Sequence, residues 1–245
     1  IISPNFKLAY GLNEDEIQNR MQKLVRYSDP AKNIETLFVW PEGVFSGYDF
    51  DEIQILKEKF QKNFDKEHLI LFGVNTYDEK GKGFYNSLVI VNNQLEILRE
   101  YKKQKLVPFG EFLPFENFFR KFGLKKITQG YSSFSSDVER KIININNINF
   151  LPLICYEIIY SGNLNKKKEI YDLILNISED GWFKNSIGLD QHFSHSKFRA
   201  IEEGKNLIRV ANNGTSAFIN PTGEIEKKIE STDKGVFEVN SFRNT

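Results

Sequence analysis

Three polar residues stand at the ends of apolar segments that we expect to form buried strands. Glu42 follows the segment 36–40, Lys103 ends the segment 95–103, and Cys155 follows the run 150–154. Because a sheet is rigid and the loops at its strand ends can vary, reacting groups are often placed there. An ionised thiol is a nucleophile and a carboxylate can take its proton, while an ammonium can lower the thiol pKa and stabilise an oxyanion. The three types therefore suit covalent catalysis without histidine.

Each of these residues also has a structural interpretation when it is taken alone. A single cysteine in an apolar run is usually a small core residue. Glu42 follows a proline and fits a turn or a helix cap, and Lys103 lies among other lysines, as at a solvated strand end. The chain has three histidines, none of which follows a buried strand in this way: His68, His192 and His195. The spacing His192-x-x-His195 has no accompanying ligand set, so we expect no metal site there.

The helices that frame these segments are predicted from periodicity and caps. Asn13 caps the first helix, Glu16 completes a capping box, and apolar residues at 17, 21, 24 and 25 form one stripe. A second amphipathic helix is predicted over 51–64. A third is predicted over 189–203 and ends at Gly204, a candidate C-cap.

Strands dominate the rest of the chain. They are predicted over 36–40, 69–74, 85–91, 95–103, 142–145, 148–155, 173–177, 207–210, 216–219 and 224–229. Short polar turns at 92–94 and 146–147 make two of the connections hairpins. Consecutive hairpins disfavour a doubly wound parallel sheet, and the mixture instead favours helices layered over two packed sheets.

Composition excludes several classes of protein. The chain has 245 residues with Lys+Arg 33 and Asp+Glu 33, so it lacks the basic excess of a dedicated nucleic-acid binder. One cysteine excludes an intrachain disulfide framework and a multi-cysteine zinc site. No apolar run approaches the roughly 18 residues that a membrane span needs. The start at Ile1 leads us to expect a processed or excised piece of a longer protein.

Four segments carry a resemblance to a known family. They are Val-Trp-Pro-Glu at 39–42, the stretch 101–114 with Leu-Val-Pro-Phe-Gly-Glu at its centre, Ile-Cys-Tyr-Glu at 154–157, and the polar motifs between 175 and 214. The chain resembles the carbon–nitrogen hydrolase (nitrilase-like) superfamily, and within it the apolipoprotein N-acyltransferases, to which the 106–111 stretch points. The resemblance implies an α+β fold, the α-β-β-α four-layer sandwich, formed by residues 1–245 as one catalytic domain.

The family's catalytic set is carried over position by position. Glu42 would be the general base, Lys103 the catalytic lysine, which stands three residues before the Leu-Val-Pro-Phe run, and Cys155 the nucleophile. The backbone N–H of the next residue and the Lys103 ammonium would form the oxyanion site. The supporting residues implied by the same resemblance are Glu111, Tyr156 and Glu157.

Two departures from the family pattern lie near this set. The acyltransferases commonly have a small hydroxyl residue and alanine after the general base, where this chain has Gly43, Val44 and Phe45. They commonly have asparagine where this chain has Glu179. The departures bear on the wall of the pocket and leave the three catalytic positions intact. The full-length family proteins also have membrane helices, so we expect either an excised domain of a membrane protein or a soluble relative.

The implied reaction is acyl transfer in two steps. The Cys155 thiolate would take an acyl chain from a phospholipid resembling phosphatidylethanolamine, and the resulting thioester would pass it to the N-terminal amine of a diacylated apolipoprotein. The resemblance implies no cofactor and no metal, and it implies a membrane surface as partner. It places the enzyme at the bacterial inner membrane, with the catalytic domain on the periplasmic side.

Aromatic residues near these motifs are candidates for a lipid entrance. Exposed apolar patches mark membrane or partner contacts, and an apolar entrance to the active site would keep water from the thioester. A core position is the alternative for each of these rings. The candidates are Phe45, Phe109, Phe112, Phe115 and Trp182.

Two other functions remain open at this level. A soluble amidase of the same superfamily, acting on a small amide, would keep Glu42, Lys103 and Cys155 and differ in its pocket. A non-catalytic domain that binds lipid or lipoprotein would have no need of the three residues together. The 106–114 stretch favours the acyltransferase.

Overall fold

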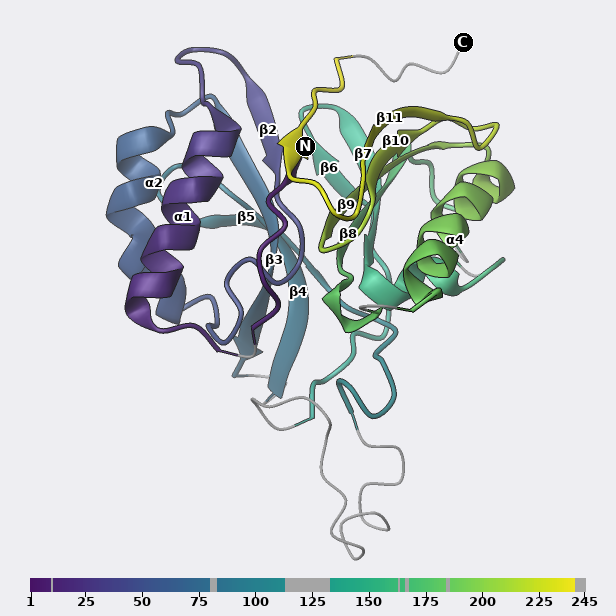
Figure 1. Cartoon of the computed structure of the whole chain (residues 1–245), viewed down its shortest axis with the longest axis horizontal. Helices are drawn as coiled ribbons and strands as arrows, with labels where there is room; N and C mark the ends of the chain where they lie inside the picture. Colours follow the sequence, from purple (N-terminus) through teal and green to yellow (C-terminus); the bar gives the residue numbers. More distant parts are fainter. Residues whose placement is uncertain are drawn as a thin grey trace, which may run out of the picture.

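Two β-sheets pack face to face, and helices cover the outer face of each, so that the chain forms four layers (Figure 1). The structure is a computed structural model, and it describes residues 1–9, 11–79, 83–112, 133–162, 164–165, 168–183 and 186–240.

The first sheet has four strands in the order β2-β3-β4-β5. Strand β2 runs parallel to β3, and the next two pairs are antiparallel, as the predicted hairpin requires. Strand β3 is longer than predicted because its polar end pairs with β4 as far as Asp78. The strands are β2 (Thr36–Val39), β3 (His68–Asp78), β4 (Gly83–Val91) and β5 (Ile97–Lys102).

The second sheet has six strands in the order β11-β10-β9-β8-β7-β6. Its central strands β7, β8 and β9 are parallel, and every residue of β8 and β9 is buried, as expected for strands covered on both faces. The strands are β6 (Ile143–Ile145), β7 (Ile148–Ile154), β8 (Leu173–Glu179), β9 (Asn206–Asn212), β10 (Ser216–Ile219) and β11 (Ile225–Ile229).

The helices begin and end close to where local signals place them. Helix α1 (Glu14–Ser28) has the predicted capping box, with Asn13 and Glu16 joined by two bonds of 2.9 Å. The segment predicted as one helix over 51–64 starts as the 3-10 helix η1 (Glu52–Leu56) and continues as α2 (Lys57–Asn63). Helix α4 (Gly188–Glu203) ends at Gly204, which adopts the left-handed conformation of a C-cap.

Three apolar cores separate the four layers. Met21, Trp40 and Phe60 belong to the core between the first sheet and helices α1 and α2. Leu71 and Leu175 belong to the core between the sheets, and a third core lies between the second sheet and α4. The predicted α-β-β-α sandwich is therefore confirmed.

A third, two-stranded sheet joins segments from near the two ends of the described chain. Strand β1 (Ile2–Ser3) pairs with β12 (Gly235–Val236) in antiparallel register. The sequence did not predict these strands because two residues are too few to show a period. Among the described residues, no helix is both long enough and apolar enough to cross a membrane.

Candidate active site

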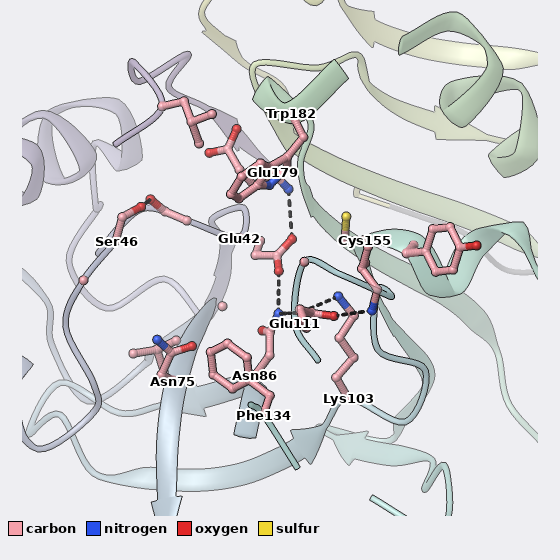
Figure 2. A pocket seen from close by; sticks show the side chains of 18 of the residues that line it. Glu42, Ser46, Asn75, Asn86, Lys103, Glu111, Phe134, Cys155, Glu179 and Trp182 are labelled. Carbon is pink, nitrogen blue, oxygen red and sulfur yellow. Dashed lines mark hydrogen bonds and ion pairs between the residues drawn. The ribbon is translucent and has the colours of Figure 1, made fainter. Parts of the chain in front are cut away.

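A cavity of about 800 Å³ opens at one edge of the two packed sheets and collects the predicted catalytic residues. Glu42, Lys103 and Cys155 all line it, together with Glu111 and Tyr156. Glu42 lies three residues after β2, and Lys103 and Cys155 directly follow β5 and β7, so all three stand close to strand ends as predicted (Figure 2). The structure therefore brings together residues separated by more than a hundred positions in the chain.

Glu42 is held by hydrogen bonds to both carboxylate oxygens. Asn86 of β4 donates its Nδ2 hydrogen to Oε1 at 2.7 Å, and the backbone N–H of Glu179 donates to Oε2 at 3.0 Å. Gly73 allows this close packing, because a Cβ there would lie 3.0 Å from the Glu42 Cα. Burial raises the pKa of Glu42, and the Lys103 ammonium opposes that rise. The carboxylate is thus a stronger base than an exposed glutamate.

Lys103 and Lys102 point to different surroundings although they are neighbours. Lys102 pairs with Asp78 at 2.7 Å on the surface and lies over the Tyr85 ring. The side chain of Lys103 is 1% exposed and pairs with Glu111 at 2.9 Å in the cavity. Burial alone would lower the pKa of Lys103, but the carboxylates of Glu111 and Glu42 hold it above its ordinary value. Lys103 is therefore a fixed ammonium in the pocket.

Cys155 stands at a sharp turn between β7 and the 3-10 helix η2 (Cys155–Ile159). Its φ is 49°, in the left-handed region that costs a non-glycine residue free energy and that recurs at active sites. Burial, followed by the Glu42 charge, raises the pKa of the Cys155 thiol to about 12, and Lys103 only partly offsets this. The expected lowering of the thiol pKa by the ammonium is thus outweighed, and the thiol is protonated at neutral pH.

Glu111 and Asn86 connect the two charged sides of the cavity. Asn86 donates to Glu111 Oε1 at 2.7 Å as well as to Glu42, and Val107 N donates to Glu111 Oε2 at 2.8 Å. Glu111 therefore fixes both Lys103 and the turn that follows it. The sequence motifs did not point to Asn86, although an asparagine inside a predominantly apolar strand is a usable signal.

Glu157 is completely buried and does not line the cavity. It accepts hydrogen bonds from the backbone N–H groups of Gln104, Lys105 and Ile154 at 3.0, 3.1 and 2.9 Å. Arg140 pairs with it at 3.1 Å. The carboxylate thereby ties the segment after Lys103 to the turn that carries Cys155.

A buried polar network supports the Cys155 turn from behind. His192 Nε2 lies 3.3 Å from the Cys155 carbonyl oxygen, and its Nδ1 lies 3.0 Å from Asp180 Oδ1. Asp180 also accepts from Ser178 at 2.6 Å and pairs with Arg209 at 2.6 Å. Burial would raise the pKa of Asp180, but Arg209 and His192 hold it below its ordinary value. Sequence analysis missed this role of His192, whose contact with Cys155 depends on how α4 packs on η2.

Breaking the Asp180–Arg209 pair is expected to destabilise the fold. The Arg209 guanidinium is 0% exposed, and Asp180→Asn would leave it buried without its counter-charge. The loss of one partner of a buried pair costs about 3–5 kcal/mol of the free energy of unfolding. Urea denaturation measures this loss. Glu230→Gln, which removes the exposed pair with Lys228, serves as the control, and it should lower the free energy of unfolding by less than about 1 kcal/mol. Equal effects of the two changes would contradict the structural role of the network.

The entrance candidates divide between surface and core. Trp182 is 46% exposed and lines the cavity, and Phe109 is 43% exposed. Phe112 is half-buried, and Phe115 lies outside the described residues. Phe45 is only 3% exposed and packs edge-on against Trp40 and Phe72, so its prediction as an exposed mouth residue is wrong. The ring belongs to the core between α1 and the first sheet, and the residue also lines the inner part of the cavity.

No metal centre is formed by the part of the chain that the structure describes, since it contains no group of three or more His, Cys, Asp or Glu side chains that could hold an ion. His192 contacts Asp180, Arg209 and the Cys155 carbonyl instead.

Glu179 is a third carboxylate of the cavity, and it titrates near neutrality. Burial raises the pKa of Glu179 from 4.5 to about 7. Below pH 4.5 both the folded and unfolded states hold the proton; as the pH rises toward 7 only the unfolded state releases it, so folding loses stability. The loss in the free energy of unfolding that follows from this difference in pKa is about 3 kcal/mol once the pH exceeds 7.

Glu179→Gln should remove this pH dependence. We expect the variant to gain stability relative to the unmodified chain between pH 5 and pH 8, by up to about 3 kcal/mol. Urea denaturation at the two pH values measures this gain in the free energy of unfolding. Glu226→Gln, at an exposed position, is the matched control. Parallel pH dependence of the Glu179 variant and the unmodified chain would show that the folded state does not hold the proton.

Relatives and solved structures resemble this chain over most of its length. It is 33% identical over 242 residues to the apolipoprotein N-acyltransferase of Wigglesworthia glossinidia brevipalpis, covering 94% of this chain and 46% of that protein. It is 33% identical over 207 residues to the apolipoprotein N-acyltransferase of Rhizobium leguminosarum, covering 82% of this chain and 39% of that protein. The chain thus spans less than half the length of these relatives.

Solved structures share the fold at low sequence identity. A CN-hydrolase superfamily protein from Xanthomonas campestris matches with a TM-score of 0.62 at 15% identity, covering 96% of this chain and 85% of that one. The glutamine-dependent NAD+ synthetase of Acinetobacter baumannii matches with a TM-score of 0.66 at 19% identity, over 95% of this chain and 43% of that one. The carbon-nitrogen hydrolase family matches residues 9–240. The chain belongs to the carbon-nitrogen hydrolase family.

Proposed function

We propose that this chain is the catalytic domain, residues 1–245, of an apolipoprotein N-acyltransferase. It would move an acyl chain from a phospholipid to Cys155 and then to the N-terminal amine of a diacylglyceryl-cysteine lipoprotein. The observation that carries the proposal is the meeting of the Cys155 thiol, the Glu42 carboxylate and the Lys103 ammonium in one cavity. The similarity to apolipoprotein N-acyltransferases over 94% of the chain supports the choice of reaction.

The first half-reaction begins with a protonated thiol. As the sulfur attacks the ester carbonyl carbon, its proton passes to Glu42, whose raised pKa suits a base at neutral pH. Lys103 and the backbone N–H of Tyr156 hold the oxyanion. The carbon–oxygen bond to the glycerol breaks, the alkoxide takes the proton from Glu42, and a lysophospholipid leaves. An acyl thioester remains on Cys155.

The second half-reaction transfers the acyl chain to an amine. The amine nitrogen attacks the thioester carbonyl, gives up a proton toward Glu42, and forms the amide as the carbon–sulfur bond breaks. The sulfur leaves and recovers a proton, which restores the resting thiol. Water competes with the amine at this stage, so an apolar cavity mouth favours transfer over hydrolysis.

The cavity entrance fits a lipid donor. Trp182 lines the cavity and is half-exposed, and an aromatic ring at such a position suits the interface between water and lipid. Phe109 is exposed on the turn that carries Glu111. We place the domain against a membrane surface, in a longer protein of the bacterial inner membrane with this domain on the periplasmic side.

The decisive experiment is intact-protein mass spectrometry after incubation with phosphatidylethanolamine in detergent. A mass gain of one acyl chain that hydroxylamine removes is the expected result. A chain that takes up no acyl group from phospholipid but hydrolyses a small amide would instead be a soluble amidase of the same family. A chain that binds lipid without reacting with either substrate would be a binding domain.

A further inference from the structure

The cavity contains a carboxylate that the two half-reactions leave without a role. Glu179 ends strand β8, and its backbone N–H holds Glu42 Oε2 while its side chain lines the same cavity. Figure 2 shows it beside Glu42, on the side away from Lys103. Glu179 is therefore placed next to the base that acts on the reacting sulfur.

Neutral donors orient this carboxylate without cancelling its charge. Gly181 N and Asn213 Nδ2 donate to Oε1 at 2.8 and 2.9 Å, and Asn212 Nδ2 donates to Oε2 at 2.6 Å. Arg20 of α1 is a nearby cation, and its guanidinium donates hydrogen bonds to the backbone carbonyl oxygens of residues 7, 43 and 44. The carboxylate is thus fixed in position and keeps its capacity to bind a cation.

Glu179 fits because Gly43 has no side chain. A Cβ on Gly43 would lie 2.8 Å from Glu179 Oε2 and 3.3 Å from its Cβ and Cγ atoms. The absence of a side chain at Gly43 therefore leaves the space that the Glu179 carboxylate occupies.

The charge of the cavity favours a cationic ligand. Among the described residues that line it are three carboxylates, Glu42, Glu111 and Glu179, and one ammonium, Lys103. Glu111 is paired with Lys103, and Arg20 of α1 acts on Glu179, so with all these groups ionised one negative charge remains in excess, on the side of Glu42 and Glu179. A primary amine with an ordinary α-amino pKa of about 7.7–8.0 reaches this site mainly as an ammonium at neutral pH.

We propose that Glu179 binds the ammonium group of the amine acceptor and takes its first proton at the acylated Cys155. The inference rests on the proposed function. The ammonium gives one proton to the Glu179 carboxylate and becomes a neutral amine. The nitrogen then forms its bond to the thioester carbonyl carbon, its second proton passes to Glu42, and the carbon–sulfur bond breaks. The sulfur takes the proton from Glu42, and Glu179 returns its own to solvent.

The proton transfer is close to balanced in free energy. The pKa of Glu179 is about 7, raised by burial, and lies just below that of an α-amine. The charged groups that act on it are Glu42, in the loop after β2, and Arg20, on α1. The neighbouring Asp180 faces Arg209 and His192 instead. Glu179 can therefore accept a proton from the acceptor and release it again within one cycle.

The test compares two nucleophiles on the preformed acyl-enzyme. Hydroxylamine attacks the thioester as a neutral molecule at neutral pH, whereas a peptide with an N-terminal S-alkylated cysteine arrives as an ammonium. In Glu179→Gln, we expect the rate with the peptide relative to hydroxylamine to fall about ten- to a hundred-fold, because one hydrogen bond to a charged group is lost. The KM for the peptide should rise, and the decline in peptide affinity below about pH 7 should disappear.

Controls separate this role from a structural one. The exposed Glu226→Gln on β11 should leave the ratio unchanged. Glu179→Asp should retain part of the peptide reaction, and Gly43→Ala, which crowds the carboxylate, should lower the ratio in a chain that keeps Glu179; these two variants decide the matter if Glu179→Gln does not fold. An equal loss with both nucleophiles, or an unchanged ratio, would overturn the inference. A failure of the unmodified chain to form the acyl-enzyme would overturn the proposed function itself.

Discussion

Replacement of Cys155 by serine is expected to abolish acylation of the chain by phospholipid, with a loss of at least about 10³-fold. A serine hydroxyl fits the same space and the same left-handed turn, with φ of 49°, so the fold should survive. The serine hydroxyl holds its proton far more tightly than the thiol does. The thiol pKa of about 12 already makes proton transfer to Glu42 unfavourable. The variant removes the nucleophile and keeps the rest of the cavity.

Intact-protein mass spectrometry measures this loss directly. The chain has one cysteine, so a hydroxylamine-sensitive acyl adduct has a single possible thiol site. A thermal melt of the serine variant within a few degrees of the unmodified chain serves as the control for folding. An adduct of normal yield in the variant would place the nucleophile at another residue.

The second large effect is expected from the two adjacent lysines. Lys103→Met should slow acylation about 10²–10³-fold, as for the loss of one oxyanion donor. Lys103 is the ammonium that reaches the cavity, where it pairs with Glu111 and acts on the Cys155 thiol. Lys102→Met removes only a surface pair with Asp78 and should slow acylation less than about threefold.

This lysine pair is a matched comparison, because the substitutions are the same and the positions are adjacent. The rate of thioester formation in single turnover is the readout, since it excludes the second half-reaction. Lys103→Met also leaves Glu42 and Glu111 without their shared cation, so its unfolding curve is measured beside its rate. Comparable losses from the two changes would contradict the assignment of Lys103 as the catalytic lysine.

Several features of the molecule followed from local chemistry and were predicted from the sequence. The capping box of α1 joins residues three positions apart, and the hairpin of β4 and β5 joins strands across a short turn, so both depend on near neighbours. The choice of Lys103 over Lys102 came from the family resemblance, in which the catalytic lysine stands three residues before the Leu-Val-Pro-Phe run. The placement of Glu42, Lys103 and Cys155 after their strands is equally local, although their catalytic roles stay predictions.

Other features depended on contacts between distant segments. Asn86 joins Glu42 to Glu111 only because β4 lies beside β3, and His192 reaches the Cys155 carbonyl only because α4 packs on η2. Phe45 follows a catalytic motif, yet its ring is buried because it packs against Trp40 and Phe72 in the core under α1. A sequence pattern shows which residue types occur and with what spacing they repeat. It does not show which distant segment a given side chain contacts in the fold.

The sequence by itself determined the order of the longer helices and strands, the family resemblance and the three residues with chemistry at strand ends, because each depends on local pattern. The tertiary structure alone decided the electrostatics: a thiol with a pKa near 12, an ammonium held between carboxylates, and Glu179 lodged in the space left by Gly43. The reason is physical. A pKa depends on burial and on charges brought together through space, and in this chain those charges come from segments that are far apart in the sequence, as Arg20 and Glu179 are.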